Sequence, residues 1–180
     1  MKTILKTYGD KASIASKLTG FDCKLDSDIE EFLRVRAIPY EKANKCRTYI
    51  IVDGGFIKEE APKILAYLSV AISNMKIKPH VSKTMNKRLV GMFQNDEAPC
   101  YLIGQLGKND RYSNEIEGRE LVNLAMDIIR IGQRAVGGRF VRVDTKKNDR
   151  LTRFYEENNF KEVQNDDESG LTQFVRFFDS

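Results

Sequence analysis

The sequence predicts an α/β protein of the α+β kind, with a mixed central sheet and helices against its faces. Residues 100–106 form a short apolar run, a polar stretch follows, and apolar residues then recur at helical spacing until Gly137. A second apolar run at 140–144 completes a strand–loop–helix–strand unit. Two further pairs of β-branched or apolar runs predict antiparallel hairpins, namely 47–52 with 64–72 and 160–163 with 171–178.

The N-terminal part is predicted from its capping and turn residues. Ile4 and Leu5 are expected in a short edge strand. Ser27 and Glu30 have the spacing of a capping box, which predicts a helix that begins at Asp26 or Ser27 and is ended or bent by Pro39. Glu41 to Lys45 is expected to be polar chain, and Asp53-Gly54-Gly55 has turn chemistry that would join the first hairpin.

In the C-terminal part, Gly137-Gly138 is expected to end the long helix, and Asn148 to cap a short helix that carries Leu151, Phe154 and Tyr155. A right-handed crossover would put the N-terminus of the long helix beside the end of the 100–106 strand. Because a helix N-terminus has unpaired N–H groups and a partial positive charge, an anion site is expected near Ser113 to Arg119.

Composition limits the class of protein. With 180 residues, of which 41% are hydrophobic and 31% charged, residues 1–180 are expected to form a single domain with one core. No run approaches the ~20 apolar residues of a transmembrane helix, and the N-terminus lacks the apolar segment of a signal peptide, so no membrane association is expected.

Three cysteines without CxxC spacing indicate a cytoplasmic protein with free thiols. The net charge of +4 suits an anionic cofactor or substrate but is low for a dedicated nucleic-acid binder.

Residues 100–163 resemble the core of the GNAT superfamily of N-acetyltransferases. The motif that carries the resemblance runs from Asn148 through Phe154-Tyr155-Glu156 to Phe160, with Asn159 at a position where the family often has Gly. Leu106-Gly107-Lys108 is similar to the end of the family's cofactor strand. The resemblance implies the GNAT fold, a mixed, mostly antiparallel sheet that splays at the cofactor strand, and transfer of an acetyl group from acetyl-CoA to a primary amine by direct attack.

The same resemblance implies roles for individual residues. The backbone of Leu106, Gly107 and Lys108 would pair with the pantetheine arm, and the Asn148 amide would hydrogen-bond it. Tyr155 would act as general acid and protonate the departing thiolate. From residue type alone, a packed aromatic is the favoured interpretation of Tyr155, and the Asn148 spacing and the preceding strand–helix–strand unit reverse that preference. Asn148 can equally be a simple helix cap. Neither the sequence nor the resemblance identifies a general base.

The pyrophosphate loop departs from the family pattern. In the ungapped register, Asn114 and Ile116 stand where small residues would let the backbone approach an anion. A longer loop is preferred, in which Gly118 marks the start of the helix and Arg119 clamps a phosphate, with Ser113 and Asn114 beside it. If the loop does not bind CoA, the alternative is a non-catalytic binding module with the same fold.

A weaker resemblance links Phe21, Cys23, Phe32-Leu33 and Ala37 to the toxin-like branch of the superfamily. That branch implies acetylation of aminoacyl-tRNA and an antitoxin partner, and a homodimer stays open. The alternative for these residues is a helix packed on the sheet. Residues 73–99 are either a helix over the acceptor site or a surface excursion.

A basic cluster and a single histidine are further candidates for a function. A basic cluster either holds CoA phosphates or RNA, or is a scattered surface: Arg134, Arg139, Arg142, Lys146, Lys147, Arg150 and Arg153. His80, the only histidine, has no dyad or ligand spacing with a cysteine, so neither a metal site nor a cysteine nucleophile is expected.

Overall fold

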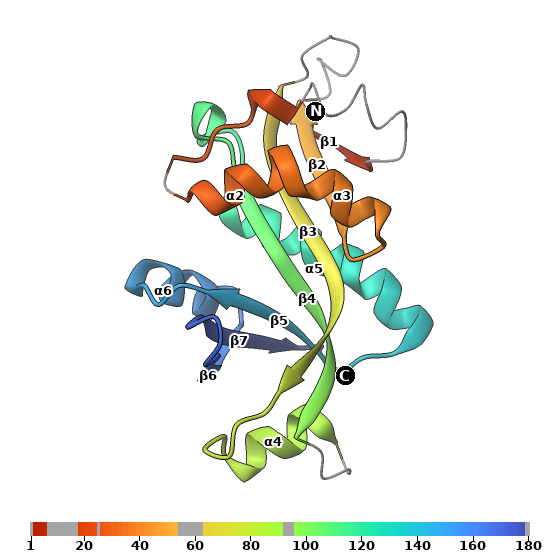
Figure 1. Cartoon of the computed structure of the whole chain (residues 1–180), viewed down its shortest axis with the longest axis vertical. Helices are drawn as coiled ribbons and strands as arrows, with labels where there is room; N and C mark the ends of the chain where they lie inside the picture. Colours follow the sequence, from red (N-terminus) through yellow and green to blue (C-terminus); the bar gives the residue numbers. More distant parts are fainter. Residues whose placement is uncertain (1, 7–17, 25, 54–62, 92–95, 179–180) are drawn as a thin grey trace. The chain divides into compact units, whose positions relative to one another are not determined.

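The computed structural model describes residues 2–6, 18–24, 26–53, 63–91 and 96–178 (Figure 1). The chain divides into two compact units. The first comprises residues 1–71 and 105–127, and the second residues 72–104 and 128–180. Two long strands, β3 (Ile64–Lys76) and β4 (Glu97–Lys108), and one long helix, α5 (Gly118–Val136), pass from one unit into the other. Each unit is therefore described by itself.

In the first unit, β1 (Lys2–Lys6) and β2 (Arg47–Asp53) pair antiparallel, with Ile4 opposite Ile51. Strand β2 also pairs antiparallel with β3, with Ile50 opposite Tyr67. The predicted edge strand and the first pair of strands are confirmed. Gly54 and Gly55 of the predicted turn lie outside the described residues.

The helical segment of this unit corrects three predictions. It consists of α2 (Ser27–Glu31), a π-helical turn at Phe32–Arg36 and α3 (Ala37–Lys42). Asp26 is the N-cap, accepting from the Asp28 N–H, so the predicted capping box of Ser27 with Glu30 is wrong. Pro39 does not end the helix, because the wider π turn, closed by the Ala37 N–H on the Phe32 carbonyl, precedes it. Residues 41 and 42, expected in polar chain, belong to α3.

Aromatic rings fill the core of the first unit. Phe21 packs edge-on against Tyr67 with 5.2 Å between ring centroids, and Phe32 stacks on Tyr67 at 6.2 Å. The Tyr67 hydroxyl donates to the Ile29 carbonyl at 2.6 Å. Phe21, Phe32, Leu33 and Ala37 are all buried in this cluster. The residues of the toxin-like motif therefore include the core that fixes the helical segment.

In the second unit, β4 pairs parallel with β5 (Phe140–Thr145), β5 antiparallel with β7 (Thr172–Phe177), and β7 antiparallel with β6 (Lys161–Asn165). Helix α6 (Asp149–Glu157) joins β5 to β6. The predicted final hairpin is confirmed. Residues 73–99 contain the end of β3, α4 (Lys83–Val90) and the start of β4. Met75, Leu89, Phe140 and Val175 lie together in the core of this unit.

The seven strands follow the order β1-β2-β3-β4-β5-β7-β6, so the sheet is mixed and mostly antiparallel, as predicted. Cys23, Cys46 and Cys100 are free thiols. Within the described ranges, no helix is long and apolar enough to span a bilayer.

Candidate functional site

The parallel ladder between β4 and β5 is short. Tyr101, Leu102 and Ile103 pair with Val141, Arg142 and Val143, and the register goes no further. Both strands continue beyond it, β4 to Lys108 and β5 to Thr145. Two neighbouring strands that remain extended after their ladder ends are the arrangement from which a splayed sheet is made. Within the second unit, Gly104 and Asp144 are the first residues beyond the ladder.

Tyr155 lies on α6 in the second unit, inside a cluster of aromatic rings. Its ring centroid is 5.2 Å from that of Phe154 and 5.7 Å from those of Phe160 and Phe174. The residue is 7% exposed, and burial raises the pKa of its hydroxyl to about 12. No described residue shares a hydrogen bond with that hydroxyl. Tyr155 thus keeps its proton through the neutral range and can serve as a proton donor.

Asn148 caps α6, as its position predicted. Its Oδ1 accepts from the N–H groups of Arg150 at 2.9 Å and Leu151 at 3.3 Å. The cap uses the amide oxygen and leaves the Nδ2 group as a donor for a second partner. At the other end of the helix, Asn159 has a φ of 63°, the left-handed conformation that Asn tolerates better than most residues and that explains the Gly of the family pattern.

In the first unit, a buried amide anchors the loop after β4. The Asn109 side chain donates to the carbonyls of Gly20 at 3.1 Å and Ile64 at 2.9 Å, and its Oδ1 accepts from the Arg111 N–H at 3.1 Å. The Asn109 N–H donates to the Leu65 carbonyl at 2.9 Å. Sequence reasoning did not single out Asn109, although a short polar residue directly after a strand is the usual signal of a loop anchor.

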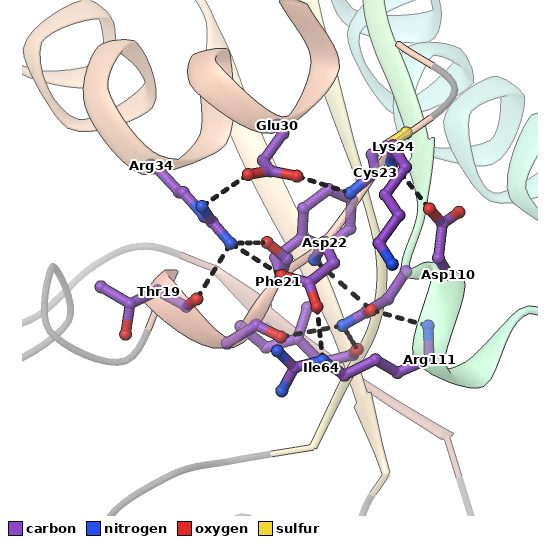
Figure 2. A network of polar contacts seen from close by, with 12 residues as sticks. Thr19, Phe21, Asp22, Cys23, Lys24, Glu30, Arg34, Ile64, Asp110 and Arg111 are labelled. Carbon is purple, nitrogen blue, oxygen red and sulfur yellow. Dashed lines mark hydrogen bonds and ion pairs between the residues drawn. The ribbon is translucent and has the colours of Figure 1, made fainter. Parts of the chain in front are cut away.

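Charged groups extend this anchor to the residues before α2 (Figure 2). Asp22 pairs with Arg111 of the loop and, at 2.8 Å, with Arg34 of the π turn. The Lys24 N–H donates to the Asp110 carboxylate at 2.7 Å. Figure 2 shows these partners converging around Asp22 from three segments. The start of the loop is therefore fixed to the helical segment of its own unit.

In the middle of the loop, Ile116 and Glu115, which depart from the family pattern, each have a local contact that accounts for them. Ile116 is 1% exposed, so the bulky side chain packs into the core rather than standing in an anion site. Glu115 forms an ion pair with Lys63 at 2.7 Å, and Lys63 lies over the Tyr112 ring at 4.7 Å. The Lys108 ammonium donates to the Ser113 carbonyl at 2.7 Å. The carboxylate of Glu115, which would repel a phosphate, is thus neutralised by a neighbour.

Helix α5 begins at Gly118, as the longer-loop register predicted. Its first backbone bond runs from the Leu121 N–H to the Glu117 carbonyl, so the N–H groups of Gly118 and Arg119 have no partner within the helix. Ser113, Asn114 and Arg119 are exposed. These groups belong to the first unit, whereas Tyr155 and Asn148 belong to the second.

The predicted basic cluster is corrected at one position. Arg142 is 8% exposed, donates to the Asn74 carbonyl at 2.9 Å and forms an ion pair with Asp144 at 3.0 Å. It is therefore an internal residue of the second unit and not part of a phosphate-binding surface. Burial raises the pKa of Asp144 above its ordinary value, against the opposing effect of Arg142. The sequence signal for Asp144 was a carboxylate directly after the apolar run 140–143, and sequence reasoning did not use it.

Among the residues that the structure describes, no group of three or more His, Cys, Asp or Glu side chains is arranged to hold a metal ion.

No family model matches the chain, and no curated protein matches it. Solved structures do. A tyrosine-to-phenylalanine mutant of KacT is 23% identical, with a TM-score of 0.73 over 97% of this chain and 94% of that one. AtaT complexed with acetyl-methionyl-tRNAfMet is 21% identical, with a TM-score of 0.73 over 99% and 94%. AtaTR bound with AcCoA is 20% identical, with a TM-score of 0.69 over 97% and 92%.

At this level of identity the likeness concerns the fold. It covers nearly the whole chain. The chain therefore has the fold of the GNAT superfamily of N-acetyltransferases, as its toxin-like members KacT and AtaT do.

Proposed function

We propose that this chain is an acetyl-CoA-dependent N-acetyltransferase that acts as a single functional domain. The observation that carries the proposal is the β4–β5 ladder, which ends after three residue pairs while both strands continue. Extended backbone beyond a ladder can pair with the amides of a pantetheine arm as it would with another strand.

The residues present fit acetyl-CoA in character. The backbone of Leu106, Gly107 and Lys108 would bind the pantetheine arm, with the free Nδ2 of Asn148 as a further donor. The N–H groups at the start of α5 and the exposed Arg119 would bind the phosphates, with Ser113, Asn114 and Gly118 beside them. The pairing of Glu115 with Lys63 reduces the repulsion that this carboxylate would exert on a phosphate.

Acetyl-CoA supplies an activated acetyl group as a thioester. The acceptor amine attacks the thioester carbonyl directly, and Tyr155 donates its proton to the departing thiolate. Because burial raises the pKa of the phenol, Tyr155 is protonated at neutral pH and acts as an acid rather than as a base.

The substitution Tyr155→Phe tests this role because it removes one hydroxyl and keeps the ring among Phe154, Phe160 and Phe174. We expect kcat, measured as thiol release, to fall by about 100-fold. The Kd for acetyl-CoA, measured by calorimetry, should stay within about twofold. Tyr101→Phe is the matched control, since the Tyr101 hydroxyl donates to the Gly137 carbonyl, and it should leave kcat unchanged. An unaltered kcat in Tyr155→Phe removes this residue from the mechanism.

A second candidate acceptor is the α-amino group of an aminoacyl-tRNA. Two observations favour it: the likeness to AtaT complexed with acetyl-methionyl-tRNAfMet spans 99% of this chain, and Phe21, Phe32, Leu33 and Ala37 of the toxin-like motif form one buried core. An antitoxin would be the corresponding protein partner.

Radiolabelled acetyl-CoA and bulk aminoacyl-tRNA test this acceptor. Label retained on tRNA, and lost when the aminoacyl ester is hydrolysed, would support it. Label transferred only to free amines would indicate a small-molecule or peptide acetyltransferase instead. Growth arrest on expression, absent in Tyr155→Phe, would be the cellular counterpart.

A further inference from the structure

A cluster of buried polar side chains surrounds the end of β5 in the second unit. Arg142, Gln164 and Gln173 are 8%, 5% and 4% exposed, and Asp144 lies among them. The ion pair of Arg142 with Asp144 removes two charges from water, and a buried ion pair contributes little to stability compared with apolar residues of the same size. Stability relative to an apolar core therefore does not explain why these charges are present.

Asp144 stands where the β4–β5 ladder ends. It is the first residue of β5 after the last pair, Ile103 with Val143. If the ladder continued by one residue, Asp144 would face Gly104, which is exposed and has no side chain. Asp144 is thus the first residue of β5 without a partner on β4, and its side chain remains partly exposed.

One oxygen of the Asp144 carboxylate is buried and one side of the group is reachable. Oδ1 is inaccessible and lies 3.0 Å from Arg142 Nε, without the angle of a directional hydrogen bond. The Asp144 side chain is 21% exposed, and the exposed surface belongs to atoms other than Oδ1. Asp144 can therefore meet a substrate proton while Arg142 holds its other oxygen.

The neighbours of Asp144 fix its orientation. Arg142 is held by the Asn74 carbonyl at 2.9 Å and the Ser73 hydroxyl at 3.4 Å. On β7, Gln173 lies opposite Asp144 in the strand register. Gln164 donates to Gln173 Oε1 at 2.8 Å and to the Lys76 carbonyl at 2.6 Å. A carboxylate held this firmly is prepared for proton transfer.

We infer that Asp144 is the general base of the acetyl transfer, the group that accepts the proton of the acceptor ammonium. The inference rests on the proposed function and adds the base that it lacks. The ammonium gives one proton to the Asp144 carboxylate, and the neutral amine forms the C–N bond with the thioester carbonyl. The C–S bond then breaks, the thiolate takes the Tyr155 proton, and the nitrogen loses its second proton, which restores the phenol through solvent. Asp144 finally releases its proton to water, so the net reaction liberates one proton.

The charges around Asp144 suit a base. Burial raises its pKa, Arg142 on the same strand lowers it, and Asp166 in the turn between β6 and β7 raises it; Gln173, on the neighbouring strand, is neutral. A raised pKa makes the carboxylate a stronger proton acceptor than an exposed aspartate. Since the base must be ionised, kcat/KM should fall as the pH drops through this pKa.

The variant Asp144→Asn tests the inference with three probes as acceptors: bulk aminoacyl-tRNA, a tripeptide with a free N-terminus, and spermidine. With the acceptor that the wild type acetylates fastest, we expect kcat/KM at pH 7 to fall about 100-fold while the Kd for acetyl-CoA is unchanged. The deficit should shrink as pH rises toward 10, because the acceptor amine then loses its proton without help. Asp167→Asn is the matched control, since Asp167 is an 86% exposed carboxylate paired with Lys78, and it should behave as the wild type.

Arg142→Gln keeps the inference testable if Asp144→Asn does not fold. Removing the positive charge raises the pKa of Asp144, so the acidic limb of the kcat/KM profile should move to higher pH by about one pH unit. An unmoved limb, or an Asp144→Asn variant with normal activity or an equal loss at every pH, overturns the assignment of the base and leaves the proposed function intact. A wild type that acetylates none of the three probes overturns both.

Discussion

At the scale of single residues, Gly107 shows why a position near the end of β4 has no side chain. A Cβ at Gly107 would lie 2.5 Å from Ile29 Cγ2 and 2.7 Å from Tyr67 Cε1. The strand thus passes directly against the helical segment of the first unit. The family resemblance covers this Gly as part of the end of a strand, and the packing against Ile29 and Tyr67 supplies a separate reason for it.

Gly107→Ala should therefore destabilise the protein. An added methyl forces backbone or ring shifts, and overpacking of this kind costs about 1–3 kcal/mol. The free energy of unfolding, measured by urea titration, should fall by that amount. Gly20→Ala is the control, because nothing lies within 4 Å of a Cβ built there. Equal stability of the two variants would show that β4 can shift away from the helix.

Residue-level prediction from sequence succeeded where local chemistry decides the structure. Asn148 was predicted as an N-cap and is one, since a cap depends on its own helix. The capping box at Ser27 failed because Glu30, the other half of the box, accepts from the Cys23 N–H and pairs with Arg34. Both partners are near in sequence, but residue spacing does not tell which of several neighbouring polar groups a side chain will bind, and the same holds for the Asp144–Arg142 pair.

At the scale of elements, we propose that the N-cap of α6, Asn148, both stabilises the helix and binds the cofactor. The Oδ1 atom of Asn148 caps the helix that carries Tyr155, and its Nδ2 is the donor proposed for the pantetheine arm. These two tasks can be separated by substitution, because the cap needs an acceptor and the pantetheine carbonyl needs a donor.

Asn148→Asp should leave the stability of the protein unchanged and weaken the binding of acetyl-CoA. The substitution retains the oxygen that accepts in the cap and loses the Nδ2 donor. Asn148→Ala should lose both, with about 1 kcal/mol of stability for the missing cap. Urea titration and calorimetry with acetyl-CoA measure the two effects. If Asp and Ala variants bind acetyl-CoA as the wild type does, Asn148 is only a cap.

Element boundaries were predicted least well, for physical reasons. Strand β4 begins at Glu97 and includes Pro99, although a proline argues against a strand. The ladder with β5 begins only at Tyr101, so at Pro99 the missing N–H removes no bond to β5. The helical segment likewise continues past Pro39 because a π turn precedes it. Both features depend on pairing and helix pitch that the sequence pattern does not contain.

At the scale of the whole molecule, the fold class was predictable from the order of strands and helices, because alternating apolar runs and turns repeat along the chain. The candidate site was predictable only in part. Tyr155 and Asn148 follow from a motif, whereas Asn109 and Asp144 became visible through partners 45 and 2 positions away. Whether the whole chain binds acetyl-CoA is a question of specificity, since a protein with net charge +4 attracts any polyanion.

A comparison of acetyl-CoA with ATP answers that question. A ligand that binds only the folded state stabilises it by RT ln(1 + [L]/Kd), about 2.7 kcal/mol at a hundredfold excess over Kd. We expect acetyl-CoA to raise the thermal midpoint at 50 mM and at 300 mM KCl, because pairing with the pantetheine arm does not depend on charge. ATP at the same concentration should act weakly and only at low salt, where general attraction is not screened. Equal effects of the two ligands, both lost at high salt, would indicate a basic surface instead of a cofactor cleft and would favour the non-catalytic binding module.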